Sequence, residues 1–312
     1  MIKTAEAVLP AFLIMGLGWL LRRVGLFTEE LVSGLNRVAF LAIFPIFLIQ
    51  KIGSQPLGEV FNGALISGTL ISYCLIWLIV FALVKLKGDV DPQRAGVIVQ
   101  GAFRPNTAVL GLAILSGAWG DAVFGPGGML LGAVVPFLNV FSVLALLLPH
   151  RDRGGLKGFG RMALAVASNP FIIGALLGTA RSASGIKPPV VIDSAFELLS
   201  DMAIPVMLLC VGGNLRLEKL RSDLGATLPT SFIKLIFMPA LTWAVLGGIF
   251  HLSGMVLAIG VIFAAAPTAM VSFIMADQMK GDSDLAASIL VMTSLFSIIT
   301  MSLWLAALFR WG

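Results

Sequence analysis

The feature that most constrains this chain is a succession of ten apolar stretches, each close to the length that crosses a lipid bilayer. A transmembrane α-helix needs about 20 predominantly apolar residues, and the polar segments between the stretches are short. The stretches run approximately over residues 5–21, 33–52, 62–84, 94–117, 122–148, 162–180, 189–213, 225–250, 255–279 and 284–309. The sequence therefore predicts an all-α polytopic membrane protein with ten transmembrane helices.

The composition agrees with this class and argues against several others. Of the 312 residues, 58% are hydrophobic and 12% are charged, whereas soluble domains carry about 25% charged residues. The net charge of +5 does not indicate nucleic-acid binding, because the basic residues lie in short groups between apolar stretches. The two cysteines and two histidines lack metal-ligand or catalytic spacing. We therefore expect no metal site, no cofactor and no enzymatic activity.

Lysine and arginine are distributed unevenly over the predicted loops. The loops after odd-numbered helices hold thirteen of them, whereas the loops after even-numbered helices and the two termini together hold five. Because cytoplasmic loops carry the excess of basic residues, both termini are predicted to lie outside. Short loops and the absence of an Asn-x-Ser/Thr sequon favour a multi-pass protein of the bacterial inner membrane.

The longest polar loop, residues 149–161, is predicted to be a cytoplasmic linker between two halves of five helices, 1–148 and 162–312. Because five is an odd number, the second half must run upside down relative to the first, which predicts an inverted repeat. Prolines support the repeat in three pairs at offsets of 160 to 162 residues, namely Pro10 with Pro170, Pro45 with Pro205, and Pro105 with Pro267. Prolines are frequent in membrane helices, so the pairs support the repeat without proving it.

The fourth predicted span is interrupted by a polar segment, Phe-Arg-Pro-Asn-Thr-Ala, at residues 103–108. Proline removes a backbone donor, and a guanidinium at bilayer depth costs at least about 2.5 kcal/mol, so such a segment must face protein or water. The ninth span has a second break at residues 265–269. Each break falls near the middle of its span, and the two spans run in opposite directions. We therefore predict that broken helices four and nine cross at the membrane midplane.

The crossing of the two breaks is the predicted binding site for an anion. The second half of each broken helix begins near Asn106 or Thr268, where unsatisfied N–H groups meet the positive end of a helix dipole. Arg104 offers a bidentate fork for a carboxylate, and its partner must come from another helix or from the substrate. An alternative is that the prolines only kink packed helices and that Asn106 caps the restart. The predicted substrate-binding residues are Arg104, Pro105, Asn106, Thr107, Pro267 and Thr268.

These motifs resemble those of the auxin efflux carrier family, whose members include plant carriers and bacterial permeases for small organic acids. The most specific matches lie at residues 103–107 and 264–269, with a weaker echo at 205–208 and 212–215, and the resemblance covers essentially the whole chain. It implies ten helices in two inverted repeats, crossed helices four and nine in a mobile domain, a scaffold of helices one, two, six and seven, and a homodimer.

The resemblance also implies that Asn106 contacts the carboxylate of the substrate. Two departures from the plant carriers bear on what that substrate is. The long hydrophilic loop of many plant carriers is reduced here to thirteen residues, and Arg104 stands where an apolar residue is expected. A small carboxylate or dicarboxylate therefore fits the sequence better than auxin does.

Other charged residues within the spans are weaker candidates. Glu197 and Asp201 lie four residues apart on one face of the seventh span, where carboxylates are possible coupling groups for protons or sodium. Alternatively, both lie in water near the outer end of that span, or they pair with Arg37. Lys234, in the eighth span, is expected to extend along its helix to the cytoplasmic surface.

The leading hypothesis from the sequence is a secondary transporter of small organic anions that works by alternating access. A sodium-coupled anion symporter of the bile-acid type, which shares crossed broken helices, is the alternative within the same class. A membrane sensor that binds an anion without transporting it would need an output domain, and we expect none because the loops and tails are short. The expected partners are a small organic anion and the lipid bilayer.

Overall fold

The computed structural model describes residues 2–147, 169–218 and 223–311, and within these ranges it contains helices and no strand. Seven of its helical stretches are long and apolar enough to cross a membrane, and a shorter apolar helix covers Gly254–Ala265. These findings agree with the predicted all-α polytopic membrane protein. The predicted linker 149–161 and the first residues of the predicted span 162–180 lie outside the described residues.

Side-chain caps and prolines place the helix boundaries in the first half of the chain. Thr28, Asn62 and Asp91 each accept a hydrogen bond from a backbone N–H in the first turn of the helix that follows. The elements are α1 (Ile2–Arg23), α2 (Glu29–Val38), η1 (Ala39–Ile43), α3 (Phe44–Gly53), α4 (Leu57–Val60), α5 (Gly63–Lys87), α6 (Pro92–Phe103), η2 (Thr107–Gly111), α7 (Leu112–Trp119), η3 (Gly120–Val123) and α8 (Phe124–Leu147).

The second half is built in the same way, with Asn169 capping α10 and Asp223 capping α12. Its elements are α10 (Pro170–Ser184), α11 (Val190–Gly213), α12 (Leu224–Phe232), η5 (Ile233–Phe237), α13 (Met238–Trp243), η6 (Ala244–Ile249), α14 (Gly254–Ala265), α15 (Met270–Gln278) and α16 (Ser283–Trp311). The wider π-helical turns η1, η2, η5 and η6 run directly into the α-helices beside them, so the boundaries between these elements do not end a span.

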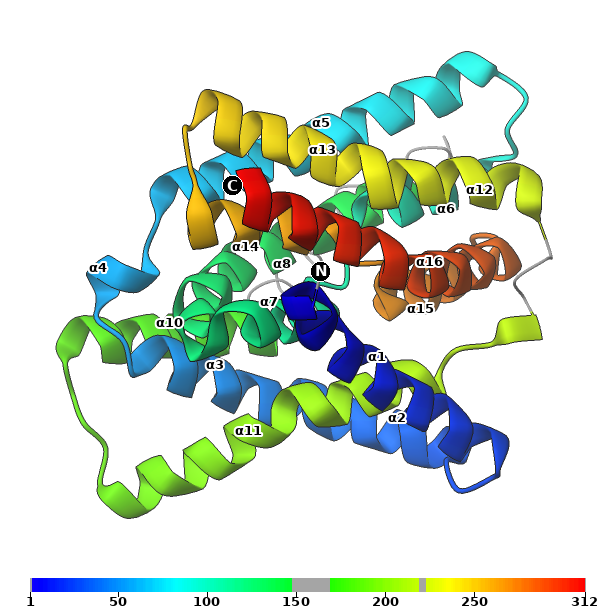
Figure 1. Cartoon of the computed structure of the whole chain (residues 1–312). Coiled ribbons are helices and arrows are strands. Elements are labelled where there is room, and N and C mark those ends of the chain that lie inside the picture. Colours follow the sequence, from blue (N-terminus) through cyan, green and yellow to red (C-terminus); the bar gives the residue numbers. More distant parts are fainter. Residues whose placement is uncertain (1, 148–168, 219–222, 312) are drawn as a thin grey trace.

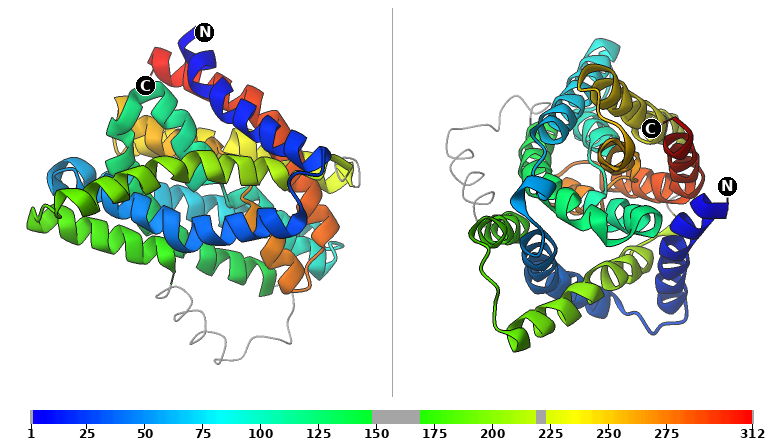
Figure 2. Two further views of the ribbon diagram at one scale, coloured as in Figure 1. Left: turned by 90° about the horizontal axis from the view of Figure 1, so that it is seen from below. Right: turned by 60° about the vertical axis from the view of Figure 1, so that its left-hand side comes forward.

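The helices form two groups (Figures 1 and 2). In one group, α1, α2, η1, α3, α10 and α11 pack on one another, and we refer to it as the scaffold group. These are the helices that the resemblance assigns to a scaffold. In the other, α5, α6, η2, α7, α8 and α12 to α16 pack together, and we refer to it as the crossover group. Contacts of α1 with α7 and of α10 with α8 join the two groups.

Small residues allow the scaffold helices to approach closely. A Cβ atom at Gly212 of α11 would lie 1.9 Å from the carbonyl oxygen of Met15 in α1. At Gly178 of α10, a Cβ atom would lie 2.8 Å from the carbonyl oxygen of Leu48 in α3. Membrane helices gain little from burying apolar surface against lipid, so close backbone packing of this kind is a main source of their association.

The core of the crossover group surrounds α14. Every residue from Leu257 to Ala265 is buried, so this helix is covered on all sides by other helices. Its last turn leads directly into the second predicted break. The structure therefore holds that break deep inside the protein, where any polar group needs a partner.

Candidate functional site

Both predicted breaks are present in the structure. Three residues separate α6 from η2, and four separate α14 from α15. Arg104, which precedes Pro105, has φ −96° and ψ 95°, and Ala266, which precedes Pro267, has φ −58° and ψ 142°. A proline disfavours helical geometry in the residue before it, so the two prolines account for the extended backbone at both positions.

The two breaks meet and pair as a short antiparallel bridge between Pro105 and Thr268. The backbone N–H of Asn106 donates to the carbonyl oxygen of Pro267 at 2.7 Å. In return, the N–H of Ala269 donates to the carbonyl oxygen of Arg104 at 3.0 Å. The prediction that the breaks come together is therefore confirmed, and each break satisfies backbone groups that the other leaves open.

The side chain of Thr268 holds the end of α6. Its hydroxyl donates to the carbonyl oxygen of Gly101 at 2.8 Å, and its backbone N–H donates to the hydroxyl oxygen of Thr293 in α16 at 3.2 Å. Thr268 is only 2% exposed. Its hydroxyl is thus engaged within the protein, and Thr268 is not among the described residues that line the cavity beside Asn106.

Lys234 holds the end of α14, and here the sequence-based expectation is wrong. The residue is fully buried, and its Nζ donates to the carbonyl oxygen of Ala264 at 2.6 Å, so it does not extend to the membrane surface. The last carbonyls of a helix have no partner within the helix and carry the negative end of its dipole. The amino group of Lys234 therefore finds an acceptor inside the protein.

Arg104 is buried and directed at α8. Its Nη1 donates to the hydroxyl oxygen of Ser142 at 2.7 Å, and its Nη2 donates to Oδ1 of Asn139 at 2.6 Å. Its Nη1 also lies 3.1 Å from Sδ of Met275 in α15. Its partners therefore come from other helices, which is one of the two possibilities that the sequence left open, and they are neutral. Arg104 is not among the described residues that line the cavity at Asn106, which is described next.

Asn106 lines a cavity of about 560 Å³ between the two helix groups. Its walls come from α2 and α11 on the scaffold side and from η2, α15 and α16 on the crossover side. Asn106 is 9% exposed, and its side chain makes no hydrogen bond to any described residue. The alternative that Asn106 serves as a side-chain cap for the restarting helix therefore does not hold in this structure.

The cavity also contains residues that the sequence analysis did not assign to the site. Ser33, Asn36, Arg37 and Phe40 lie on the cavity face of α2 and η1, and Asn214 at the end of α11 lies across from them. Their spacing of three, four and seven residues is that of one helix face, which is a readable signal. The sequence alone does not show that this face meets the break at Asn106.

The two candidate coupling carboxylates lie away from the crossing. Asp201 pairs with Lys51 of α3 at 3.3 Å, and Glu197 is exposed on α11. Neither contacts Arg104 or Arg37, so the suggested pair between Glu197 and Arg37 is absent from the described structure. Their role in coupling stays a prediction. Among the described residues there is also no group of three or more His, Cys, Asp or Glu side chains placed to hold a metal ion.

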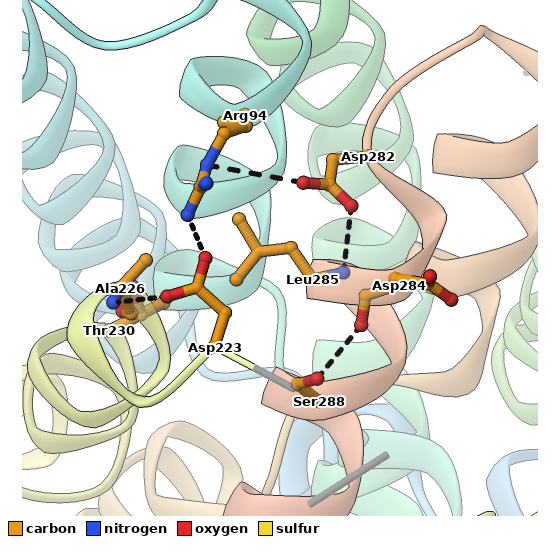
Figure 3. A network of polar contacts seen from close by, with 8 residues as sticks. All are labelled: Arg94, Asp223, Ala226, Thr230, Asp282, Asp284, Leu285 and Ser288. Atoms are coloured by element: carbon orange, nitrogen blue, oxygen red, sulfur yellow. Dashed lines mark hydrogen bonds and ion pairs between the residues drawn. The ribbon is translucent and has the colours of Figure 1, made fainter. Parts of the chain in front are cut away.

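A charged cluster fixes the start of α6 (Figure 3). Arg94 forms ion pairs with Asp223, which caps α12, and with Asp282, which caps α16, the second at 4.0 Å. Negative side chains are favoured at helix N-termini, so each aspartate is stabilised both by the helix that it caps and by Arg94. The cluster ties the first half of the first broken helix to two neighbours in the crossover group.

Apolar helices that surround two paired helix breaks, with a cavity at their crossing, are the organisation of a membrane transporter. The chain belongs to the membrane transport protein family, whose model matches residues 4–305, and this confirms the resemblance to the auxin efflux carriers.

Two relatives match the chain along nearly its whole length. A protein of Methanothermobacter thermautotrophicus, named an uncharacterized transporter, is 25% identical over 310 residues, which is 96% of this chain and 97% of the relative. A protein of Rhizobium meliloti, provisionally named a malonate transporter, is 23% identical over 324 residues, which is 97% of this chain and 95% of the relative.

Proposed function

We propose that the protein is a secondary transporter of small organic anions, with carboxylates or dicarboxylates as substrates, and that it works by alternating access. The observation that carries the proposal is the side chain of Asn106, which lines a cavity between the two helix groups and makes no hydrogen bond to any residue that the structure describes. An amide that faces a cavity and makes no hydrogen bond to a described residue is free to bind a ligand there.

The proposed site uses each residue of the crossing differently. Asn106 donates to the carboxylate of the substrate, and the N-terminal N–H groups of η2 and α15 add positive potential on the same side. Arg104 contributes positive charge at the break and fixes the break to α8. The remaining members, Pro105, Thr107, Pro267 and Thr268, shape the two breaks and hold them together.

Ten membrane helices in two inverted repeats are part of the proposal, although the described residues contain seven stretches that are individually long and apolar enough to cross a membrane. One of the seven, Thr107–Leu147, joins the second half of the first broken helix (η2 with α7) to α8. The predicted spans without a stretch of their own are the first broken helix, the second broken helix (α14 with α15), and α10, whose predicted start lies outside the described residues. The same proposal places the protein in a bacterial inner membrane as a homodimer, with both termini outside.

The name of the Rhizobium relative supports a small dicarboxylate as the substrate class, because malonate is one. The sodium-coupled alternative has less support. In transporters with broken helices, carbonyls at the C-terminal ends of half-helices commonly bind the coupling ion. In this protein Nζ of Lys234 already donates to such a carbonyl at the end of α14.

The test is substrate binding to an Asn106→Ala variant. Loss of one hydrogen bond to a charged ligand is worth about 1.5 to 3 kcal/mol, so affinity for the transported anion should fall roughly ten- to a hundredfold. The measurement is the thermal shift of the purified protein with a panel of mono- and dicarboxylates, followed by uptake into proteoliposomes.

Val109→Ala is the matched control, because Val109 lines the same cavity and carries no polar group. This control should keep its affinity within about threefold, which is less than 1 kcal/mol. If a folded Asn106→Ala protein binds and transports its anion as the unmodified protein does, the site lies elsewhere.

A further inference from the structure

The charges around the cavity do not balance. Among the residues that the structure describes, the charged ones that line it are Glu29, Arg37 and Arg216. Glu29 is engaged twice, by Arg216 at 3.0 Å and by Arg22 at 3.5 Å. Arg37 forms no ion pair or hydrogen bond with any residue that the structure describes. The charged lining therefore sums to one uncompensated positive charge, which we assign to Arg37.

Arg37 and Asn106 line the same cavity from different helix groups. Arg37 belongs to α2 of the scaffold group, whereas Asn106 precedes η2 in the crossover group. Asn36 and Phe40 share the cavity face of the helix with Arg37. An anion in the cavity can therefore contact a cation on one helix group and an amide on the other.

The surroundings make this cation unusual. The rest of the wall is largely apolar, with Met207 and Val211 of α11 and Leu290 of α16 among its members. A guanidinium close to apolar surface attracts an anion more strongly than it would in open water, because the local dielectric constant is lower. Arg104 does not fill this role in the present conformation, because its guanidinium is bound to Ser142 and Asn139.

We propose that Arg37 binds the second carboxylate of a small dicarboxylate whose first carboxylate is bound by Asn106. This inference rests on the proposed function and deepens it, because it names the residue that selects the substrate class. The planar guanidinium binds a carboxylate through two parallel hydrogen bonds, which an ammonium group does not reproduce. One ligand would then connect the scaffold and crossover groups across the cavity.

The experiment compares malonate with acetate as probes, in the purified full-length protein. Arg37→Gln should lower the affinity for malonate at least about tenfold and leave the affinity for acetate within about threefold. Arg37→Lys should give an intermediate loss for malonate, because it keeps the charge and loses the planar fork. Arg310→Gln is the control, since it removes an exposed positive charge that does not line the cavity.

The outcomes separate this inference from the proposed function. If Asn106→Ala weakens binding of both probes while Arg37→Gln leaves the ratio of malonate to acetate affinity unchanged, the role of Arg37 is refuted and the proposed site stands. An equal loss for both probes in Arg37→Gln also refutes the assignment to the second carboxylate. If Asn106→Ala binds both probes normally, the proposed site itself fails. Because Arg37 is exposed to the cavity, its variants are expected to fold.

Discussion

The two helix breaks share a backbone design and differ in their side chains. In each, a proline forces the preceding residue into an extended conformation, and each provides one backbone N–H donor and one carbonyl acceptor to the bridge between them. The first break carries Arg104 and Asn106, whereas the second, over residues 266–269, carries Thr268 as its one polar side chain. The backbone frame is thus nearly symmetric, and the chemistry is concentrated on one side.

The half-helix ends repeat this asymmetry. The end of α6 is held by the hydroxyl of Thr268, whereas the end of α14 is held by the longer side chain of Lys234 through its Nζ. Arg104 is likewise engaged, by α8. Among these described polar side chains, Asn106 is the one without a protein partner. The two breaks therefore differ in their ability to bind a ligand, because only a polar side chain without a partner is available to do so.

The largest expected effect tests whether the two breaks are related by an inverted repeat. Asp89 and Asp121 lie just before and just after the first broken helix, and both are exposed. With Cys74 and Cys210 replaced, Asp121→Cys should react completely with an impermeant thiol reagent applied from outside, and Asp89→Cys should not react. The reverse pattern would overturn the predicted orientation, with both termini outside. Labelling of both positions from one side would mean that the first broken helix does not cross the membrane, and the inverted repeat would then fail.

A second prediction concerns what Arg104 does for the first break. Arg104→Met would leave Ser142 and Asn139 without their buried donor, at about 1 to 3 kcal/mol each, and this loss is partly offset because no guanidinium is buried. We expect a net destabilisation of about 2 kcal/mol, measured as thermal unfolding in detergent without ligand.

The double variant Arg104→Met with Asn139→Leu provides the control for this prediction. It should lose less stability than the sum of the single variants, because the two side chains interact directly. An Arg104→Met protein that keeps full stability yet loses substrate binding would instead assign the guanidinium to the substrate, as the sequence alone allowed.

The positions of the two breaks could be predicted from the local sequence, whereas the hydrogen-bond partners of their side chains could be identified only from the structure. Prolines at 105 and 267 interrupt apolar spans in a readable way, because their effect on the preceding residue is local. The neutral partners of Arg104 in α8 lie 35 and 38 residues along the chain, and no local pattern selects them over Glu197 or Asp201.

For Lys234, the sequence predicted a position for the side chain that the structure contradicts. Its expected path to the membrane surface followed from the length of its side chain. Its actual acceptor is the carbonyl oxygen of Ala264 at the end of α14. That contact depends on how the two helices pack, which the local sequence does not show. The cavity face of α2 could be read from its spacing, but its position in the same cavity as Asn106 could not.

The smallest expected effect comes from the second break and completes the comparison. Thr268→Val is nearly isosteric and removes the hydroxyl that donates to the carbonyl oxygen of Gly101. A typical buried hydrogen bond contributes about 0.5 to 1.5 kcal/mol, so stability should fall by about 1 kcal/mol, and Thr268→Ser should restore most of it. Substrate affinity should change by less than about threefold, because the N–H groups at the start of α15 remain. If Thr268→Val instead weakens binding as much as Asn106→Ala does, both breaks contact the substrate equally and the proposed asymmetry is wrong.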